Sequence, residues 1–223
     1  MGVLASLVAA TLIVASVLSA GGDKSSAPQK VFGDDTAALL DGIPQNGPDL
    51  GRPDAPVTLV EFADIQCPYC AQWSQEAFPE IVRDYVRTGK VRVVFAGLDF
   101  LGPDSEKGLR FAVAAGDQGK LWNAVHLLYA NQGAENSGWI TDELLQGVGA
   151  ATPGFHTKEA LDATSAPSTG KEMAEAEALA RRLEVQGTPS FAAGRAGEDI
   201  SLLPVRSLDA DGLRPFLDQL LAE

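Results

Sequence analysis

The chain's only two cysteines lie three positions apart, in the segment Cys67-Pro68-Tyr69-Cys70. An apolar run typical of a buried strand, residues 57–62, stands just before this segment, and a helical pattern of apolar residues follows it. The sequence therefore predicts a pair of thiols at a strand-to-helix turn. Because no third cysteine exists, no structural disulfide can form elsewhere without consuming this pair.

The start of a helix is a favourable place for a thiolate. Backbone N–H groups in the first turn have no helical partner, and the helix dipole adds partial positive charge there. If Cys67 is the N-cap and Pro68 the first helical residue, the sulfur of Cys67 points at free amides. We therefore expect its pKa to lie below the roughly 8.5 of a free thiol.

The two sulfurs are expected to play different roles. Thiol–disulfide exchange needs an exposed attacking sulfur and a nearby sulfur that resolves the mixed disulfide. Cys67 is predicted to be the exposed nucleophile, and Cys70, one turn further into the helix, the buried resolving thiol. The pair would then be a redox-active centre that needs no other cofactor.

Two other interpretations of the pair remain. A structural zinc site usually needs four ligands, but the two histidines, His126 and His156, are thirty residues apart and lack finger-like spacing. A purely structural disulfide would normally close a longer loop than this one. We expect no metal site.

A second feature lies some 120 residues downstream, in Gly187-Thr188-Pro189. The proline follows a long helical pattern, residues 171–184, and precedes a short β-type run that starts at Ser190. Because proline cannot donate to a strand ladder, it is expected at the start of a strand. An ordinary trans turn is the alternative interpretation.

Taken together, these motifs resemble the thioredoxin superfamily, and most closely its DsbA-like branch of extracytoplasmic thiol–disulfide oxidoreductases. The resemblance covers roughly residues 40–221. It implies an α/β protein with a thioredoxin fold and an inserted helical subdomain at about 104–184. The matching motifs are Ala55-Pro56-Val57, Glu61-Phe62, Cys67-Pro68-Tyr69-Cys70, the segment from Gly116 to Trp122, and Gly187-Thr188-Pro189.

The resemblance also implies which residues meet a substrate. It makes Thr188–Pro189 a cis peptide bond that lies against the cysteine turn and leaves the preceding backbone free to pair with a substrate chain. Pro68, Tyr69, Thr188 and Pro189 are thus expected to bind substrate. Better-studied oxidases of the family have His at the position of Tyr69, and because Tyr cannot carry positive charge, we expect a weaker oxidant.

Glu61 is the third expected catalytic residue. Strand alternation places it on the same face as Leu59, either buried or at an exposed edge. The resemblance implies burial beneath the cysteines, where the carboxyl passes a proton to or from Cys70. Desolvation would raise its pKa, which suits proton transfer.

The activity implied by the resemblance is disulfide formation in exported proteins by exchange through Cys67–Cys70. Re-oxidation would need a membrane quinone-linked partner of the DsbB or vitamin K epoxide reductase type. Two alternatives stay open: a reductase or isomerase fed by a membrane donor, and a non-catalytic thioredoxin-like binding domain.

The N-terminus and the charge point to an exported domain. Residues 1–22 carry no charged side chain and are predicted to be a signal peptide or a membrane anchor, although a buried helix is possible. Residues 23–35 are expected to be a flexible tether and 36–223 one domain, in an extracytoplasmic location. The formal net charge of −13 disfavours nucleic acid and anionic membrane surfaces as ligands.

The other expected elements follow from periodicity and breakers. We expect Trp122 and His126 to pack in the core and the acidic segment 172–177 to face solvent, with Met173 on the same face. The expected elements are a helical turn and an irregular entry segment over 36–51, a helix over 68–88 kinked at Pro79, a strand at 91–95, short helices at 141–149 and 158–163, a hairpin of 190–193 with 200–203, and a closing helix at 209–222.

Overall fold

The structure, a computed structural model, describes residues 34–223. The predicted signal or anchor, and all but the end of the predicted tether, lie outside the described residues. The first helix, α1 (Asp34–Leu40), begins two residues before the predicted domain. In the described part, every helix is too short or too polar to cross a membrane.

A six-stranded sheet forms the centre, in the order β1-β2-β4-β3-β5-β6. The central pair β3 and β4 is parallel, and β5 adds to β3 in the antiparallel direction. The expected strands and the hairpin of β5 with β6 are confirmed. The bounds are β1 Gln45–Asn46, β2 Asp49–Leu50, β3 Val57–Asp64, β4 Val91–Leu98, β5 Ser190–Arg195 and β6 Ser201–Leu202.

The hairpin of β1 and β2 was not predicted, because we expected irregular chain there. Each strand has only two residues, which is too short to show alternation, and β2 is held by antiparallel pairing with β4. This edge is therefore set by tertiary pairing.

The connection from β3 to β4 is helical, and it is interrupted as predicted near Pro79. Helix α2 (Pro68–Glu76) ends at Ala77, and a short α3 (Phe78–Ile81) continues into a π-helical turn, Val82–Val86. Proline lacks the N–H that a continuous helix needs, and its ring is too close to the preceding turn. The helix therefore breaks just before Pro79. Together β3, these helices and β4 form a βαβ unit.

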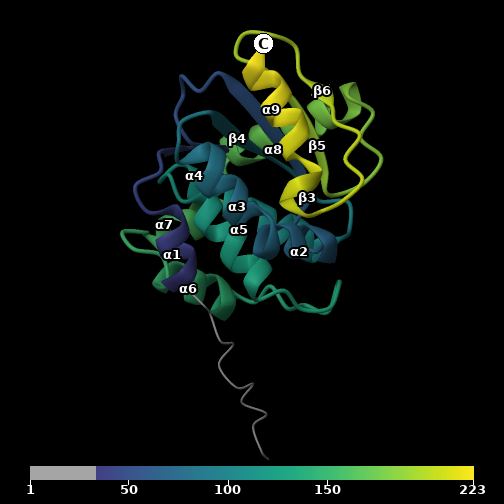
Figure 1. Cartoon of the computed structure of the whole chain (residues 1–223). Coiled ribbons are helices and arrows are strands. Elements are labelled where there is room, and N and C mark those ends of the chain that lie inside the picture. Colours follow the sequence, from purple (N-terminus) through teal and green to yellow (C-terminus); the bar gives the residue numbers. More distant parts are fainter. Residues whose placement is uncertain (1–33) are drawn as a thin grey trace, which may run out of the picture.

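Five helices lie between β4 and β5, which confirms the helical insertion. Figure 1 shows α5 and α6 gathered with α1 at one end of the molecule, while α9 and the C-terminus lie at the other. The bounds are α4 Pro103–Gly116, α5 Leu121–Ala130, α6 Asp142–Ala150, α7 Thr157–Ala163 and α8 Pro167–Arg182; a 3₁₀ turn, Ala210–Gly212, and α9, Arg214–Ala222, close the chain.

The two faces of the sheet carry different cores. Leu59 of β3 joins the larger cluster with α2, α5 and α9, whereas Val60 and Phe62 join a smaller one with Ala180 of α8. Because Glu61 alternates with Val60 and Phe62, its side chain lies on the face of the larger cluster, towards α2.

The expectation that the acidic segment of α8 faces solvent was wrong for two residues. Met173 packs against the larger core, and Glu172 is half-buried in a cavity of about 170 Å³ between α8 and β4. Burial raises the pKa of Glu172 to about 7. The cause is the packing of α8 across β4, which helical periodicity does not reveal.

Candidate active site

The cysteine turn has the predicted local geometry. Cys67 is the N-cap of α2 with extended backbone angles, and Pro68 stands in the first turn. The Cys67 sulfur accepts a hydrogen bond from the backbone N–H of Cys70, at 3.4 Å. Both cysteines are free thiols in this structure.

The second motif lies against the first. The Thr188–Pro189 bond is cis, as expected, and the Cys67 thiol donates a hydrogen bond to the Thr188 carbonyl, at 3.3 Å. The fold thus joins two segments 121 residues apart in sequence. This contact brings Cys67, Thr188 and Pro189 into one site.

The expectation of an exposed Cys67 was wrong, because only 4% of this residue is exposed. The Thr188 carbonyl lies against its sulfur. Next to it, Pro68 is exposed, and Tyr69 is 61% exposed. The attacking sulfur therefore sits just under the surface, beside an exposed aromatic ring.

The two thiols have opposite electrostatic environments. A hydrogen bond from the Cys70 thiol, helped by the backbone N–H groups of Tyr69 and Cys70, lowers the pKa of Cys67 to about 6, although burial opposes the shift. The bond to the Thr188 carbonyl belongs to the neutral thiol and is lost on ionisation. Burial raises the pKa of Cys70 well above its ordinary value. Cys67 is therefore the thiolate of the pair at neutral pH.

Glu61 is buried beneath the cysteines, with 2% of the residue exposed, as the resemblance implied. Burial raises its pKa to about 8, while the indole N–H of Trp73 acts in the opposite direction. The negative charge of Cys67 raises it further. At neutral pH this carboxyl is mainly protonated and can give up a proton near the cysteines.

Sequence reasoning missed two residues that hold the cysteine turn, one in the last turn of α5 and one just after this helix. The Gln132 side-chain amide donates to the carbonyls of Ile65, at 2.8 Å, and Cys67, at 3.2 Å. The Tyr129 hydroxyl donates to the carbonyl of Asp64, at 3.1 Å. Tyr129 and Gln132 stand three positions apart around the C-terminal end of an apolar helix. This spacing is the one signal in the sequence, and it does not indicate which groups the two side chains bind.

The carboxylate of Asp64 ties the end of β3 to the loop after β4. It accepts hydrogen bonds from the backbone N–H groups of Gln66, at 2.8 Å, and Leu101, at 3.1 Å, and from the Ser105 hydroxyl. Burial raises its pKa. The helical insertion and the cysteine turn are thus connected through polar groups as well as through apolar packing.

His126 is in the core, as predicted, and its ring nitrogen Nδ1 lies 2.7 Å from the Ser74 hydroxyl. Burial lowers its pKa to about 4. The unfolded chain, with an ordinary pKa near 6.5, binds a proton that the folded chain does not, so stability is lost as pH falls from 6.5 to 4.

We expect that His126→Gln flattens the pH dependence of the free energy of unfolding in this window, by up to about 3 kcal/mol. Urea unfolding at several pH values measures it. The control is His156→Gln, because that side chain is 70% exposed; an unchanged slope in His126→Gln would contradict the assignment.

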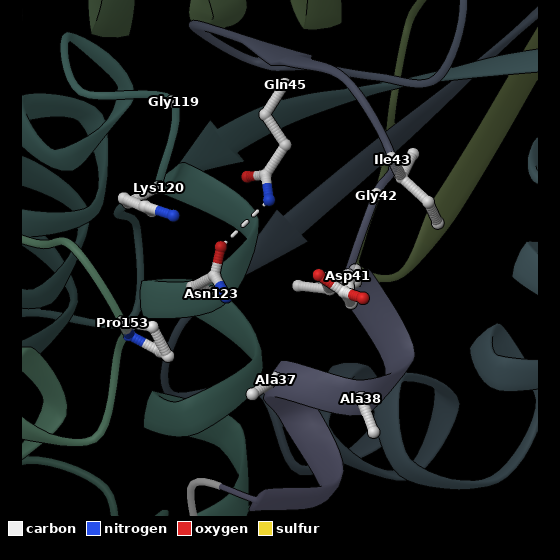
Figure 2. A pocket seen from close by; sticks show the side chains of 11 residues that line it. Ala37, Ala38, Asp41, Gly42, Ile43, Gln45, Gly119, Lys120, Asn123 and Pro153 are labelled. Atoms are coloured by element: carbon white, nitrogen blue, oxygen red, sulfur yellow. Dashed lines mark hydrogen bonds between the residues drawn. The ribbon is translucent and has the colours of Figure 1, made fainter.

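One cavity lies near the N-terminal end of the described chain and does not reach the cysteines. Figure 2 shows this cavity, of about 390 Å³, between the end of α1 and the start of α5, where Gln45 donates to Asn123 at 2.8 Å. None of the predicted site residues lines it. Within residues 34–223, no group of three or more His, Cys, Asp or Glu side chains is arranged to hold a metal ion.

Comparisons with known proteins agree with the fold. The sequence model of the family described as Thioredoxin matches residues 45–201, and the chain therefore belongs to this family. A probable disulfide bond formation protein D from Bacillus anthracis is 32% identical over 152 residues, which span 63% of this chain and 66% of the relative. The DsbA-like resemblance of the sequence is thus confirmed at the level of family and fold.

Two solved structures show the same architecture. BdbD from Bacillus subtilis aligns with a TM-score of 0.68 at 22% identity, over 81% of this chain and 98% of that one. A thioredoxin-like oxidoreductase from Silicibacter pomeroyi aligns with a TM-score of 0.63 at 28% identity, over 86% and 99%. The predicted thioredoxin fold with a helical insertion is confirmed.

The difference between the pKa values of Cys67 and Cys70 predicts that the two thiols react at different rates. In the reduced protein we expect only Cys67 to be alkylated rapidly at neutral pH, with a thiolate absorbance that titrates near pH 6. Mass spectrometry after brief iodoacetamide treatment identifies the labelled residue. Faster labelling of Cys70, or titration of Cys67 near its ordinary pKa, would reverse the assigned roles.

Proposed function

We propose that this protein is a thiol–disulfide oxidoreductase that forms disulfides in exported proteins through Cys67 and Cys70. The observation that carries the proposal is a pair of unlike thiols. Cys67 lies at a helix N-terminus, accepts a hydrogen bond from the backbone N–H of Cys70 and has a pKa of about 6, whereas the Cys70 thiol is buried and its pKa is raised well above the ordinary value. The relative named disulfide bond formation protein D supports this direction.

The proposed reaction has two exchange steps. A substrate thiolate attacks Cys67 of the oxidised enzyme, the Cys67–Cys70 bond breaks, and Cys70 leaves and takes up a proton. A second substrate thiolate then attacks the substrate sulfur of the mixed disulfide, which releases the Cys67 thiolate and the substrate disulfide. Two electrons pass from the substrate to the enzyme.

Glu61 supplies the proton that Cys70 needs. Because the pKa of Cys70 is well above its ordinary value, its bare thiolate is a poor leaving group. The protonated carboxyl of Glu61 stabilises it by proton transfer, and the reverse step uses the carboxylate as a base. Cys67, Cys70 and Glu61 are thus the proposed catalytic residues.

Substrate is proposed to bind along Thr188 and Pro189, beside Pro68 and Tyr69. The ladder between β5 and β3 starts at Ser190, so the backbone before it makes no strand pairs within the described residues. An extended substrate segment could add there as a short strand, a common mode of peptide recognition. The exposed ring of Tyr69 offers an apolar contact next to the cysteine.

The proposed location is extracytoplasmic, with residues 1–22 as signal or anchor. Re-oxidation is proposed to come from a membrane quinone-linked protein, because a disulfide donor must be regenerated by an oxidant. The second candidate is a reductase or isomerase. It is favoured by Tyr69, which cannot stabilise the Cys67 thiolate by charge as a histidine would.

Oxidation of a reduced, unfolded ribonuclease tests the activity. With the oxidised protein in stoichiometric amount, we expect loss of ribonuclease thiols much faster than with an equal concentration of glutathione disulfide. A Cys67→Ser, Cys70→Ser double variant is the control. No acceleration over glutathione disulfide would refute the proposed activity.

A further inference from the structure

Two buried polar groups lie next to each other under the cysteines. Glu61 is 2% exposed and Trp73 is 1% exposed, and the indole nitrogen of Trp73 makes no hydrogen bond of standard geometry to any described residue. Phe191 stands directly opposite Glu61 in the strand ladder, and the Trp73 ring packs edge-on against Phe191 with centroids 4.7 Å apart. Paired positions on adjacent strands share one face, so the indole lies beside the carboxyl.

A buried N–H without a partner is unfavourable, and so is a buried carboxylate without donors. Each group supplies what the other lacks, but only when the carboxyl is ionised, because a hydrogen bond from a neutral N–H favours the charged form of its acceptor. The effect of the indole on the pKa of Glu61 has this direction. The pair is therefore matched to one protonation state of the carboxyl.

We propose that Trp73 is a positioning residue for Glu61, whose indole N–H donates a hydrogen bond to the carboxylate formed when Glu61 gives its proton to Cys70. The role assigned to this proton transfer rests on the proposed function. In the step, the Glu61 proton moves to the leaving sulfur of Cys70, the negative charge moves to the carboxylate, and the indole N–H stabilises that charge. No electron is exchanged in this transfer.

Other groups around Glu61 cannot take this part. The titratable groups that face it are Cys67 and Cys70 from α2 and Tyr129 from α5. The negative charge of Cys67 raises the pKa of the carboxyl. Cys70 is the proposed acceptor of the Glu61 proton, and the charge of Glu61 raises the pKa of Cys70. The Tyr129 hydroxyl already donates a hydrogen bond to the Asp64 carbonyl. The strand positions paired with Glu61 are phenylalanines, Phe95 on β4 and Phe191 on β5. Trp73 is thus the neutral donor of the cluster.

The test is a carboxyl titration by ¹³C NMR of the oxidised full-length protein, in which neither cysteine titrates. Burial also raises the pKa of Tyr129 well above its ordinary value, so Glu61 is the group that changes charge there. In Trp73→Phe, which keeps an aromatic ring against Phe191, we expect the Glu61 midpoint to move up by about one pH unit. A shift of this size means that the acid dissociation constant of Glu61 is about tenfold smaller in the variant.

The matched control is Trp139→Phe, which removes the other buried indole N–H without a partner in the described residues, in the loop between α5 and α6. It should leave the Glu61 midpoint in place. In the unsubstituted protein, the Trp73 indole proton shift should titrate with the same midpoint as Glu61, and Glu61→Gln should abolish that titration.

An unchanged or lower Glu61 midpoint in Trp73→Phe, or a Trp73 indole shift that ignores Glu61, would overturn the inference. Neither measurement involves turnover. The inference about Trp73 can therefore fail while the ribonuclease assay succeeds. Conversely, the ribonuclease assay can fail while the two titrations give the expected result.

Discussion

Replacing Cys70 with serine is expected to convert the protein into a trap for its substrates. Exchange at Cys67 can still form a mixed disulfide, but the buried thiol that would release it is gone. Incubating the variant with oxidised, unfolded ribonuclease should produce a covalent adduct that persists for hours without reductant. Non-reducing electrophoresis and mass spectrometry of the linked peptides identify the bond.

Cys67→Ser is the matched variant, with the same chemical change three residues away. We expect no adduct, because Cys70 is fully buried and burial raises its pKa well above its ordinary value. The rate of thiol–disulfide exchange by the Cys67→Ser variant should be at least about a thousandfold lower than that of the Cys70→Ser variant, because the nucleophile is the thiolate. Equal adduct formation by the two variants would contradict the assigned roles.

Replacing Glu61 with glutamine is expected to slow exchange while it stabilises the fold. Glutamine keeps the shape but can neither give a proton to Cys70 nor accept one from it. The closure of a Cys67–glutathione mixed disulfide by Cys70 should slow by about 10²-fold at pH 7, the lower range for general acid–base catalysis. Stopped-flow measurement of glutathione release gives this rate.

The stability effect follows from the pKa of Glu61. The folded value of about 8 lies above the ordinary 4.5, so the unfolded chain releases this proton at lower pH. The free energy of unfolding therefore falls as pH rises from 4.5 to 8, by several kcal/mol and at most about 5. Glu61→Gln removes this loss, and we expect higher stability than the parent at pH 8.

Glu172→Gln is the control for both measurements. It removes another carboxyl whose pKa burial raises, to about 7, but on the opposite side of the sheet from the cysteines. It should stabilise the protein at pH 8 to a smaller extent and leave closure unchanged. A Glu61→Gln variant with normal closure at pH 7 would remove Glu61 from the mechanism.

The parts of the site that the sequence predicted are those set by local chemistry. Cys67 stands between the strand pattern and Pro68, and this position predicts that it caps α2. Strand alternation places Glu61 on one face of β3. The helical insertion was predictable because strand patterns are missing between β4 and β5. The cis bond at Thr188 came from the family resemblance, not from the residues alone.

The parts that the sequence did not predict depend on contacts between distant segments. Cys67 is covered because the Thr188 carbonyl, 121 residues away, lies on its sulfur. Gln132 reaches the cysteine turn from the end of α5, and α8 buries Glu172 against β4. The periodicity of apolar residues along the sequence does not predict such contacts, because each of them depends on how the helices are placed around the sheet.

The most direct test of the account is the reduction potential of Cys67–Cys70, measured in glutathione buffers at pH 7. Stabilising a thiolate favours the reduced form and makes a disulfide more oxidising. A pKa of about 6 for Cys67 lies between the values near 7 in thioredoxin and 3.5 in DsbA, whose potentials are about −270 and −120 mV. We therefore expect a reversible two-electron equilibrium between these limits. A potential at or below about −270 mV, or a disulfide that does not exchange with glutathione, would contradict a disulfide-forming function.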